Sequence, residues 1–201
     1  MKGLKTKQKV IEAAISLFNV KGYDGTSVRE IAKTAEVNIA LVSYYFGGKK
    51  GLLEHLLASF YEGYLKELSD ALNNEDTDAA TCLKDAVFRL LKYQENHDYL
   101  SRFVHREMTI DTMLVREVMT TYLMKEKYLL EQLLEIGIED GIFKEMQVDF
   151  GVMHIRNLII MPFLHPQYMR ENFYINLEDE SFKNDYFNYV SDVIETYFCR
   201  K

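Results

Sequence analysis

The sequence predicts an all-α protein in two parts: an N-terminal helical domain at residues 1–50 and a larger α-helical domain at residues 51–201. The 201 residues contain only two prolines and ten glycines, which favours long helices over a loop-rich β fold. Apolar residues recur at three- and four-residue spacing along most of the chain. The two parts also carry charge of opposite sign.

Charge is distributed unevenly along the chain. The whole chain has a formal net charge of −7, yet residues 1–50 contain nine Lys or Arg and four Asp or Glu, a net of +5. The remainder therefore carries −12. A basic N-terminal part on an acidic body indicates that only this part meets a polyanion.

The first predicted helix covers residues 5–21. Its apolar stripe consists of Val10, Ile11, Ala14, Leu17 and Phe18. Gly22 follows at the expected left-handed C-cap. Lysines precede this segment as in a signal peptide, but Glu12, Ser16 and Asn19 interrupt the apolar run. We therefore expect the first helix of a cytoplasmic protein.

Two short helices follow, and their caps can be read from the sequence. Ser27 and Glu30 fit a capping box at the start of a helix at 27–34, with Thr26 as a competing N-cap. Asn38 can cap a third helix at 38–45, which Gly47 ends. Three short helices with a brief second connection form a helix-turn-helix pattern.

The third helix separates a core face from an outer face. Val37, Val42 and Phe46 are spaced to face the core. The outer positions are Ile39, Ala40, Leu41, Ser43 and Tyr44. Small and hydroxyl-bearing side chains suit a major groove, while Tyr45 and Lys49, at the end of this helix and the start of the next, suit phosphate oxygens. The alternative is that Tyr44 and Tyr45 pad the joint between the two parts.

The body is predicted to consist of six further helices. They cover residues 49–73, 80–97, 98–109, 112–139, 148–164 and 180–199, and Pro162 and Pro166 bend or terminate the fifth. The helices at 148–164 and 180–199 carry more apolar residues than a body of this size needs to bury internally. We expect a four-helix homodimer seam, since palindromic recognition by helix-turn-helix modules needs two copies. A well-filled core is the alternative.

No catalytic motif is found, so neither enzymatic activity nor a cofactor or metal is expected. The five histidines are scattered along the chain. His105, Glu107 and His154 are a weak candidate for a metal site; the alternative is that the histidines are solvated or lie in the core. A small-molecule pocket is a second possibility. Its adaptable lining would be Phe103, Met108, Met113, Met119, Tyr122 and Met124, which otherwise simply fill the core.

A cluster of charged residues lies in the middle of the acidic body. It consists of Arg102, Arg106, Glu107, Arg116 and Glu117. Arginine is favoured where a carboxylate is gripped at an interface. The cluster is either a docking surface for a protein partner or a set of internal salt bridges.

The segment TSVREIAKTAEVNIALVSYYFGGKKGLLEHLL (26–57) resembles the DNA-binding signature of the TetR family of bacterial regulators. The resemblance covers roughly residues 8–57. It implies that Phe46 is a core residue and that DNA contacts come from Ser27, Asn38, Tyr44, Tyr45 and Lys49. Glu36 and Ala40 stand where the family has glycines, and Ser43 where tyrosine is frequent. The charge of Glu36 puts a close phosphate contact at the turn in doubt.

Longer segments resemble a branch of this family from spore-forming bacilli. They are SYYFGGKKGLLEHL, RFVHREMTIDTMLVREVMTTYLMKEKY and MPFLHPQY. The resemblance implies a homodimer that binds short palindromic DNA motifs and affects assembly of the division protein FtsZ around sporulation through the C-terminal domain. The alternatives are a ligand-released transcriptional repressor and, from another class, a helical adaptor that never binds DNA.

Overall fold

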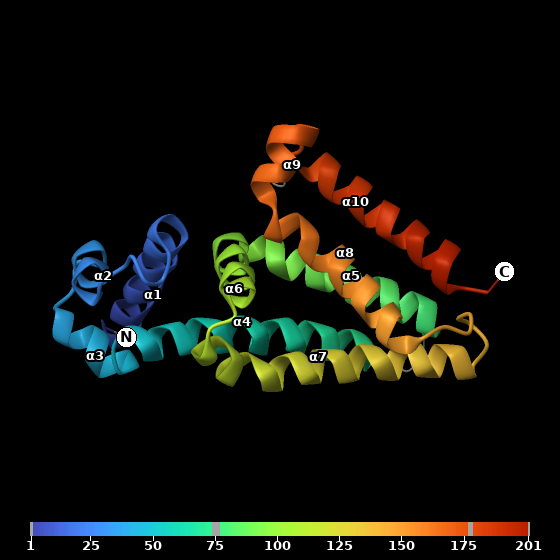
Figure 1. The fold of residues 1–201 in the computed structure, drawn as a ribbon, viewed down its shortest axis with the longest axis horizontal. Coiled ribbons are helices and arrows are strands. Elements are labelled where there is room, and N and C mark those ends of the chain that lie inside the picture. Colours follow the sequence, from blue (N-terminus) through green and yellow to red (C-terminus); the bar gives the residue numbers. More distant parts are fainter. Residues whose placement is uncertain (1, 74–76, 177–178, 201) are drawn as a thin grey trace. The chain divides into compact units, whose positions relative to one another are not determined.

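The computed structural model describes residues 2–73, 77–176 and 179–200, and most of these lie in helices joined by short connections (Figure 1). The elements are α1 (Lys2–Lys21), α2 (Val28–Thr34), α3 (Ile39–Phe46), α4 (Lys49–Leu72), α5 (Ala79–Asn96), α6 (Asp98–Ile110), α7 (Met113–Glu139), α8 (Val148–Leu164), α9 (Pro166–Phe173), α10 (Glu180–Val193) and a π-helical turn η1 (Ile194–Phe198). Within the described ranges the one β feature is an isolated bridge between Phe143 and Cys199. The all-α prediction is confirmed.

The helices form two compact units. The N-terminal unit comprises residues 1–61 and 97–119, and the C-terminal unit comprises residues 62–96 and 120–201. Both α4 and α7 contribute residues to each unit. The predicted division after residue 50 falls at the start of α4, whereas the N-terminal unit also includes α6. The reason is that α6 packs on α1, with the Phe18 and Phe103 rings stacked at 5.1 Å.

In the N-terminal unit, the stripe of α1 packs on α2 and α6. Val10, Ala14 and Phe18 are fully buried, and Ile31 of α2 closes the same core. Gly22 takes φ +75° at the end of α1, the left-handed cap that the sequence predicts. This small core fixes how α2 and α3 are presented.

In the C-terminal unit, α5 packs on α8 and α10 (Figure 1). Its core includes buried polar groups: Glu126, 1% exposed, accepts hydrogen bonds of 3.0 Å from the Tyr64 hydroxyl and from Nε of Arg156. Gln94, also buried, donates to the Ile159 carbonyl at 2.9 Å. Buried polar groups with partners of this kind fix a unique packing of α4, α5, α7 and α8.

The segment after Leu164 differs from its prediction. Pro162 lies inside α8, and the helix continues to Leu164. Pro166 does follow the end of α8, as predicted. It also occupies the first turn of α9, a helix that the sequence did not predict. Across the described part of the chain, none of the helices combines the length and apolar character needed to cross a bilayer.

Candidate DNA-binding interface

The start of α2 is held by a capping box. The Glu30 amide donates to Oγ of Ser27 at 3.2 Å, and the Ser27 amide donates to the Glu30 carboxylate at 2.9 Å. Thr26 is not the N-cap: its hydroxyl donates to the Gly22 carbonyl at 2.8 Å, and the residue is 2% exposed. Ser27 is therefore the cap and stands at the exposed N-terminus of α2, where amide groups favour an anion.

The carboxylate of Glu30 stays ionised at neutral pH. A hydrogen bond from Lys21, 2.6 Å long, and further bonds from Ser27 lower the pKa of Glu30 to about 2. Lys21 also balances its charge. Because the charges of Glu30 and Lys21 offset each other, the N-terminus of α2 repels a phosphate only weakly.

Helix α3 is built as an exposed recognition helix. Asn38 caps it, accepting a 2.9 Å hydrogen bond from the Ala40 amide, and Gly47 ends it at φ +72°. Its inner face is buried at Val42 and Phe46, while Val37 is half-buried. The outer positions Asn38, Ile39, Ala40, Ser43 and Tyr44 are exposed, and Leu41 is half-buried. The predicted core face holds at Val42 and Phe46 and the outer face at the exposed positions, while Val37 and Leu41 are intermediate.

The two adjacent tyrosines have different environments. Tyr44 is 79% exposed, whereas Tyr45 is half-buried and its hydroxyl lies so close to α1 that a Cβ at Gly3 would stand 3.2 Å away. The two rings meet edge to face at 5.1 Å. Tyr45 therefore braces Tyr44, and Tyr44 is the ring that solvent or a ligand meets.

Lys49 opens α4 beside the end of α3. Its Nζ donates a 3.0 Å hydrogen bond to the Tyr23 carbonyl and lies 4.3 Å from the centre of the Tyr23 ring. The ammonium group has three donors, so this bond leaves capacity for a phosphate oxygen. The contact with Tyr23 holds the charge in place, which sequence reasoning did not foresee.

Glu36 lies in the turn between α2 and α3 in the left-handed conformation, with φ +56°. A glycine adopts this conformation without steric cost, and the family resemblance implies a glycine at this position. The Glu36 carboxylate is exposed and lies 3.8 Å from Nζ of Lys9. The lysine offsets part of its charge at the turn.

The predicted partner surface is only partly a surface. Arg102 pairs with Asp98 at 2.8 Å, Arg116 with Asp111 at 2.6 Å, and Glu117 is exposed. Glu107 is 3% exposed, so it does not belong to a docking surface. Glu107 lies on the inward face of α6, the helix that packs on α1.

Arg106 is engaged inside the N-terminal unit. Its guanidinium donates to the carbonyl oxygens of Phe18 and Asn19 at the end of α1 and lies 3.7 Å from Glu107. The salt-bridge alternative therefore applies to Arg106 and Glu107, and in part to Arg102 and Arg116, which pair with acids on their own segment. Arg102, Arg116 and Glu117 remain as candidates.

The alternative of a methionine-lined pocket does not fit the burial of its residues. Met113 is 77% exposed and Met124 is 66% exposed, while Phe103 and Met119 are buried core residues. The exposed Met113 and Met124 cannot line an enclosed pocket, whereas Phe103 and Met119 belong to the core, as the second reading expects. Among the described residues, no group of three His, Cys, Asp or Glu side chains could hold a metal ion, and His105 is buried against the Phe60 ring at 5.9 Å.

A capped, solvent-facing helix on a small basic helical unit defines a helix-turn-helix DNA-binding protein. The family model for bacterial regulatory proteins of the tetR family matches residues 10–56. The chain is 46% identical to the probable HTH-type transcriptional regulator YttP of Bacillus subtilis strain 168 over 196 residues, which cover 97% of this chain and 95% of that protein. The chain belongs to the TetR family of DNA-binding transcriptional regulators.

Solved structures agree with this fold. A tetR-family regulatory protein from Rhodococcus RHA1 aligns with a TM-score of 0.79 at 17% identity, covering 98% of both chains. The TetR-family regulator PfmR from Thermus thermophilus aligns with a TM-score of 0.78 at 19% identity, covering 95% of this chain and 99% of PfmR. These likenesses extend through both units.

Proposed function

We propose that the chain acts as a homodimer that binds short palindromic DNA sites through α3. The observation that carries this proposal is the 79% exposed Tyr44 on a capped helix whose other face is buried. Ser27, Asn38, Tyr45 and Lys49 position the unit on phosphates, while Ile39, Ala40, Leu41, Ser43 and Tyr44 meet base edges and thymine methyl groups.

The dimer is proposed to form through α8 and the segment of α10 and η1. The inner face of α8 is buried, whereas Phe150 and Met153 on the same helix are 65% and 57% exposed. On the second segment, Tyr189 and Tyr197 remain 57% and 66% exposed. These apolar positions on the two predicted helices support a seam that a second copy covers.

Sedimentation velocity tests the seam. We expect the native protein to sediment at twice its 23.6 kDa chain mass, and Phe150→Glu to shift it toward the monomer. Tyr128→Glu, at a 59% exposed position on α7, is the control that should remain dimeric. A native monomer, or a Phe150→Glu dimer as stable as the native one, would refute the seam.

A role in cell division is the finer proposal. The support is the resemblance of three long segments to RefZ, a TetR-type regulator of spore-forming bacilli that affects FtsZ. Arg116 and Glu117 offer exposed charges on the N-terminal unit for such a partner, and Arg102 is half-buried beside Asp98.

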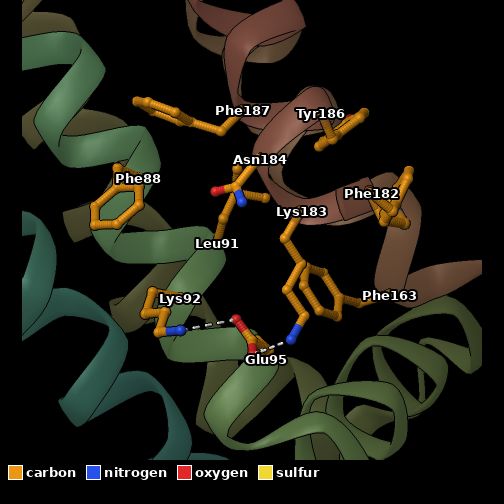
Figure 2. A pocket seen from close by; sticks show the side chains of 11 residues that line it. Phe88, Leu91, Lys92, Glu95, Phe163, Phe182, Lys183, Asn184, Tyr186 and Phe187 are labelled. Carbon is orange, nitrogen blue, oxygen red and sulfur yellow. Dashed lines mark hydrogen bonds and ion pairs between the residues drawn. The ribbon is translucent and has the colours of Figure 1, made fainter. Parts of the chain in front are cut away.

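Sedimentation of FtsZ polymers formed with GTP, with and without the protein, tests this role. Native protein should change the pelleted fraction, and Arg116→Ser should lose that effect while keeping DNA binding. An unchanged fraction with native protein would leave the second function, a repressor released by a small molecule. A cavity of about 140 Å³ in the C-terminal unit, between α5, the end of α8 and α10 and walled mainly by aromatic rings, favours that alternative (Figure 2).

A further inference from the structure

A second lysine lies beside the C-terminal end of the recognition helix. Nζ of Lys7, on α1, stands 5.5 Å from the centre of the ring of Phe46, the last residue of α3. Lys7 is half-buried, unlike Lys5 and Lys9 on the same helix, which are exposed. The residues assigned so far to DNA contacts do not include Lys7.

The ring of Phe46 holds this ammonium group in place. Phe46 is only 9% exposed and packs on the His55 ring of α4 at 5.3 Å, so the ring itself is fixed. A cation within about 6 Å of a ring centre is attracted to the face of the ring. A lysine that is ordered in this way has less rotamer freedom to lose when it binds an anion.

Within the described residues, Lys7 has no carboxylate partner. Two other lysines of the N-terminal unit do have one: Nζ of Lys9 lies 3.8 Å from the Glu36 carboxylate, and Nζ of Lys50 lies 3.7 Å from the Glu54 carboxylate. Because no acid of the described chain pairs with Lys7, its charge is available to an anion outside the protein.

The hydroxyl of Tyr45 lies along the same face of α1. A Cβ at Gly3 would stand 3.2 Å from this hydroxyl. Gly3 precedes Lys7 by four residues, which places the two positions on one face of the helix. Hydroxyl and ammonium groups are both donors that proteins direct at the phosphate oxygens of DNA. One face of α1 therefore offers two such donors next to the end of α3.

The arrangement of Lys7 repeats that of Lys49. Nζ of Lys49 lies 4.3 Å from the centre of the Tyr23 ring, and Lys49 follows Phe46 by three residues. Two lysines, each held over an aromatic ring, thus adjoin the end of α3. We propose that Lys7 is a second phosphate contact, positioned by the Phe46 ring, and that it binds the DNA backbone together with Lys49 and the Tyr45 hydroxyl.

This assignment deepens the proposed DNA recognition and rests on α3 facing DNA. It makes α1 part of the interface and gives Phe46 a second role besides filling the core. A phosphate contact is independent of base sequence, so Lys7 contributes to the binding of any duplex. The contact raises affinity and fixes the register of α3 on the duplex without selecting the bases.

The test measures the dissociation constant of the full chain for a mixed-sequence DNA duplex at several salt concentrations, by fluorescence anisotropy. Lys7→Met retains an apolar side chain over Phe46 and removes the charge. It should flatten the slope of log Kd against log salt concentration by roughly one unit per chain, two per dimer. Lys7→Arg should keep the native slope. A native slope in Lys7→Met would overturn the proposal.

Lys9→Met is the matched control on α1. Because Lys9 is paired with Glu36, this substitution should change the slope clearly less than Lys7→Met does. An equal change in the two variants would assign the effect to the overall charge of α1 and refute a specific contact at Lys7.

A double-mutant cycle tests the role of Phe46. Phe46→Leu keeps the core apolar and removes the ring, so it should weaken DNA binding in the native protein but not in Lys7→Met. The same loss in both backgrounds would refute positioning by the ring. Thermal unfolding checks each variant. If Phe46→Leu does not fold, Lys7→Met and Lys7→Arg still decide whether the charge contacts a phosphate.

Failure of this contact and failure of the proposed function give different results. A slope that depends on Lys7, without any palindrome selected from a random DNA pool, would retain the phosphate contact and refute palindrome recognition. A selected palindrome with a slope that does not depend on Lys7 would retain the recognition helix and refute the phosphate contact.

Discussion

The guanidinium of Arg106 on α6 donates a 3.0 Å hydrogen bond to the main-chain carbonyl oxygen of Asn19 at the end of α1. A second bond from the same group reaches the Phe18 carbonyl. In return, the Asn19 side chain donates to the Tyr99 carbonyl at 2.8 Å. The Phe18 carbonyl also accepts a 2.9 Å hydrogen bond from the Gly22 amide, so α6 adds donors to the carbonyl groups at this end of α1. These contacts join the scaffold of the DNA-binding unit to α6.

Replacing Arg106 by Met should destabilise the protein by about 1–2 kcal/mol, because two carbonyls lose a charged donor. Arg116→Met is the control: its ion pair with Asp111 is exposed, with the two side chains 66% and 58% accessible, so its loss should cost clearly less than that of Arg106. Urea unfolding followed by circular dichroism measures both. Equal effects of the two substitutions would show that the contacts with α1 contribute nothing particular.

Glu107→Gln should stabilise the protein at neutral pH. Burial raises the pKa of Glu107 above its ordinary value, although Arg106 opposes the shift. The ionised form is thus less favourable in the folded state than in the unfolded state. The stabilising contribution of this group is present below its unfolded pKa and is lost as pH rises through its folded pKa.

The gain from Glu107→Gln should therefore appear in the melting temperature at pH 7.5 and shrink toward about pH 4, where the carboxyl is largely protonated in both states. Glu117→Gln, at an exposed position of α7, is the control. A gain that is independent of pH would contradict this explanation. One Glu107 oxygen has no hydrogen bond within the described chain, which is consistent with the cost of ionisation.

Glu36→Gly should stabilise the protein by roughly 0.5–1 kcal/mol. Glycine relieves the left-handed strain at φ +56°, offset in part by the greater freedom of the unfolded chain. Glu36→Ala removes the same charge and keeps the strain, so it should show no gain. Chemical unfolding distinguishes the two; equal stabilities would mean that φ is not the cause.

Lys49→Ala should weaken binding to all DNA sequences about equally. The salt dependence of binding should flatten by roughly one unit of slope per phosphate contact, two per dimer. Anisotropy titrations at several salt concentrations measure this slope, with Lys66→Ala as the control. Because Lys49 also binds the Tyr23 carbonyl, unfolding must be checked in parallel. A changed base preference would contradict the phosphate role.

Local features of the interface could be predicted from the sequence. The capping box of Ser27, the Asn38 cap and the Gly47 end depend on residues within a few positions of each other, and each lies where the pattern predicts. The separation of Tyr44 from Phe46 follows from helical periodicity in the same way. Such signals need no knowledge of distant packing.

Tertiary features could not be predicted in this way. Arg106 and Glu107 occur in an apparently charged stretch, and only the packing of α6 on α1 shows that both point inward. Lys183 meets Glu95 across 88 residues of sequence. Helix α9 was missed because it has only eight residues and begins at Pro166, which was interpreted only as the end of the preceding helix. These positions depend on which helices meet.

Selection of bound duplexes from a random DNA pool tests the central claim most directly. It should be run with the native protein, with Tyr44→Ala, and with Tyr128→Ala as an exposed tyrosine outside the interface. Recovery of one short palindrome by the native protein and Tyr128→Ala, but not by Tyr44→Ala, is the predicted result. An unenriched native pool, or the same palindrome recovered with Tyr44→Ala, would contradict α3 as the recognition helix.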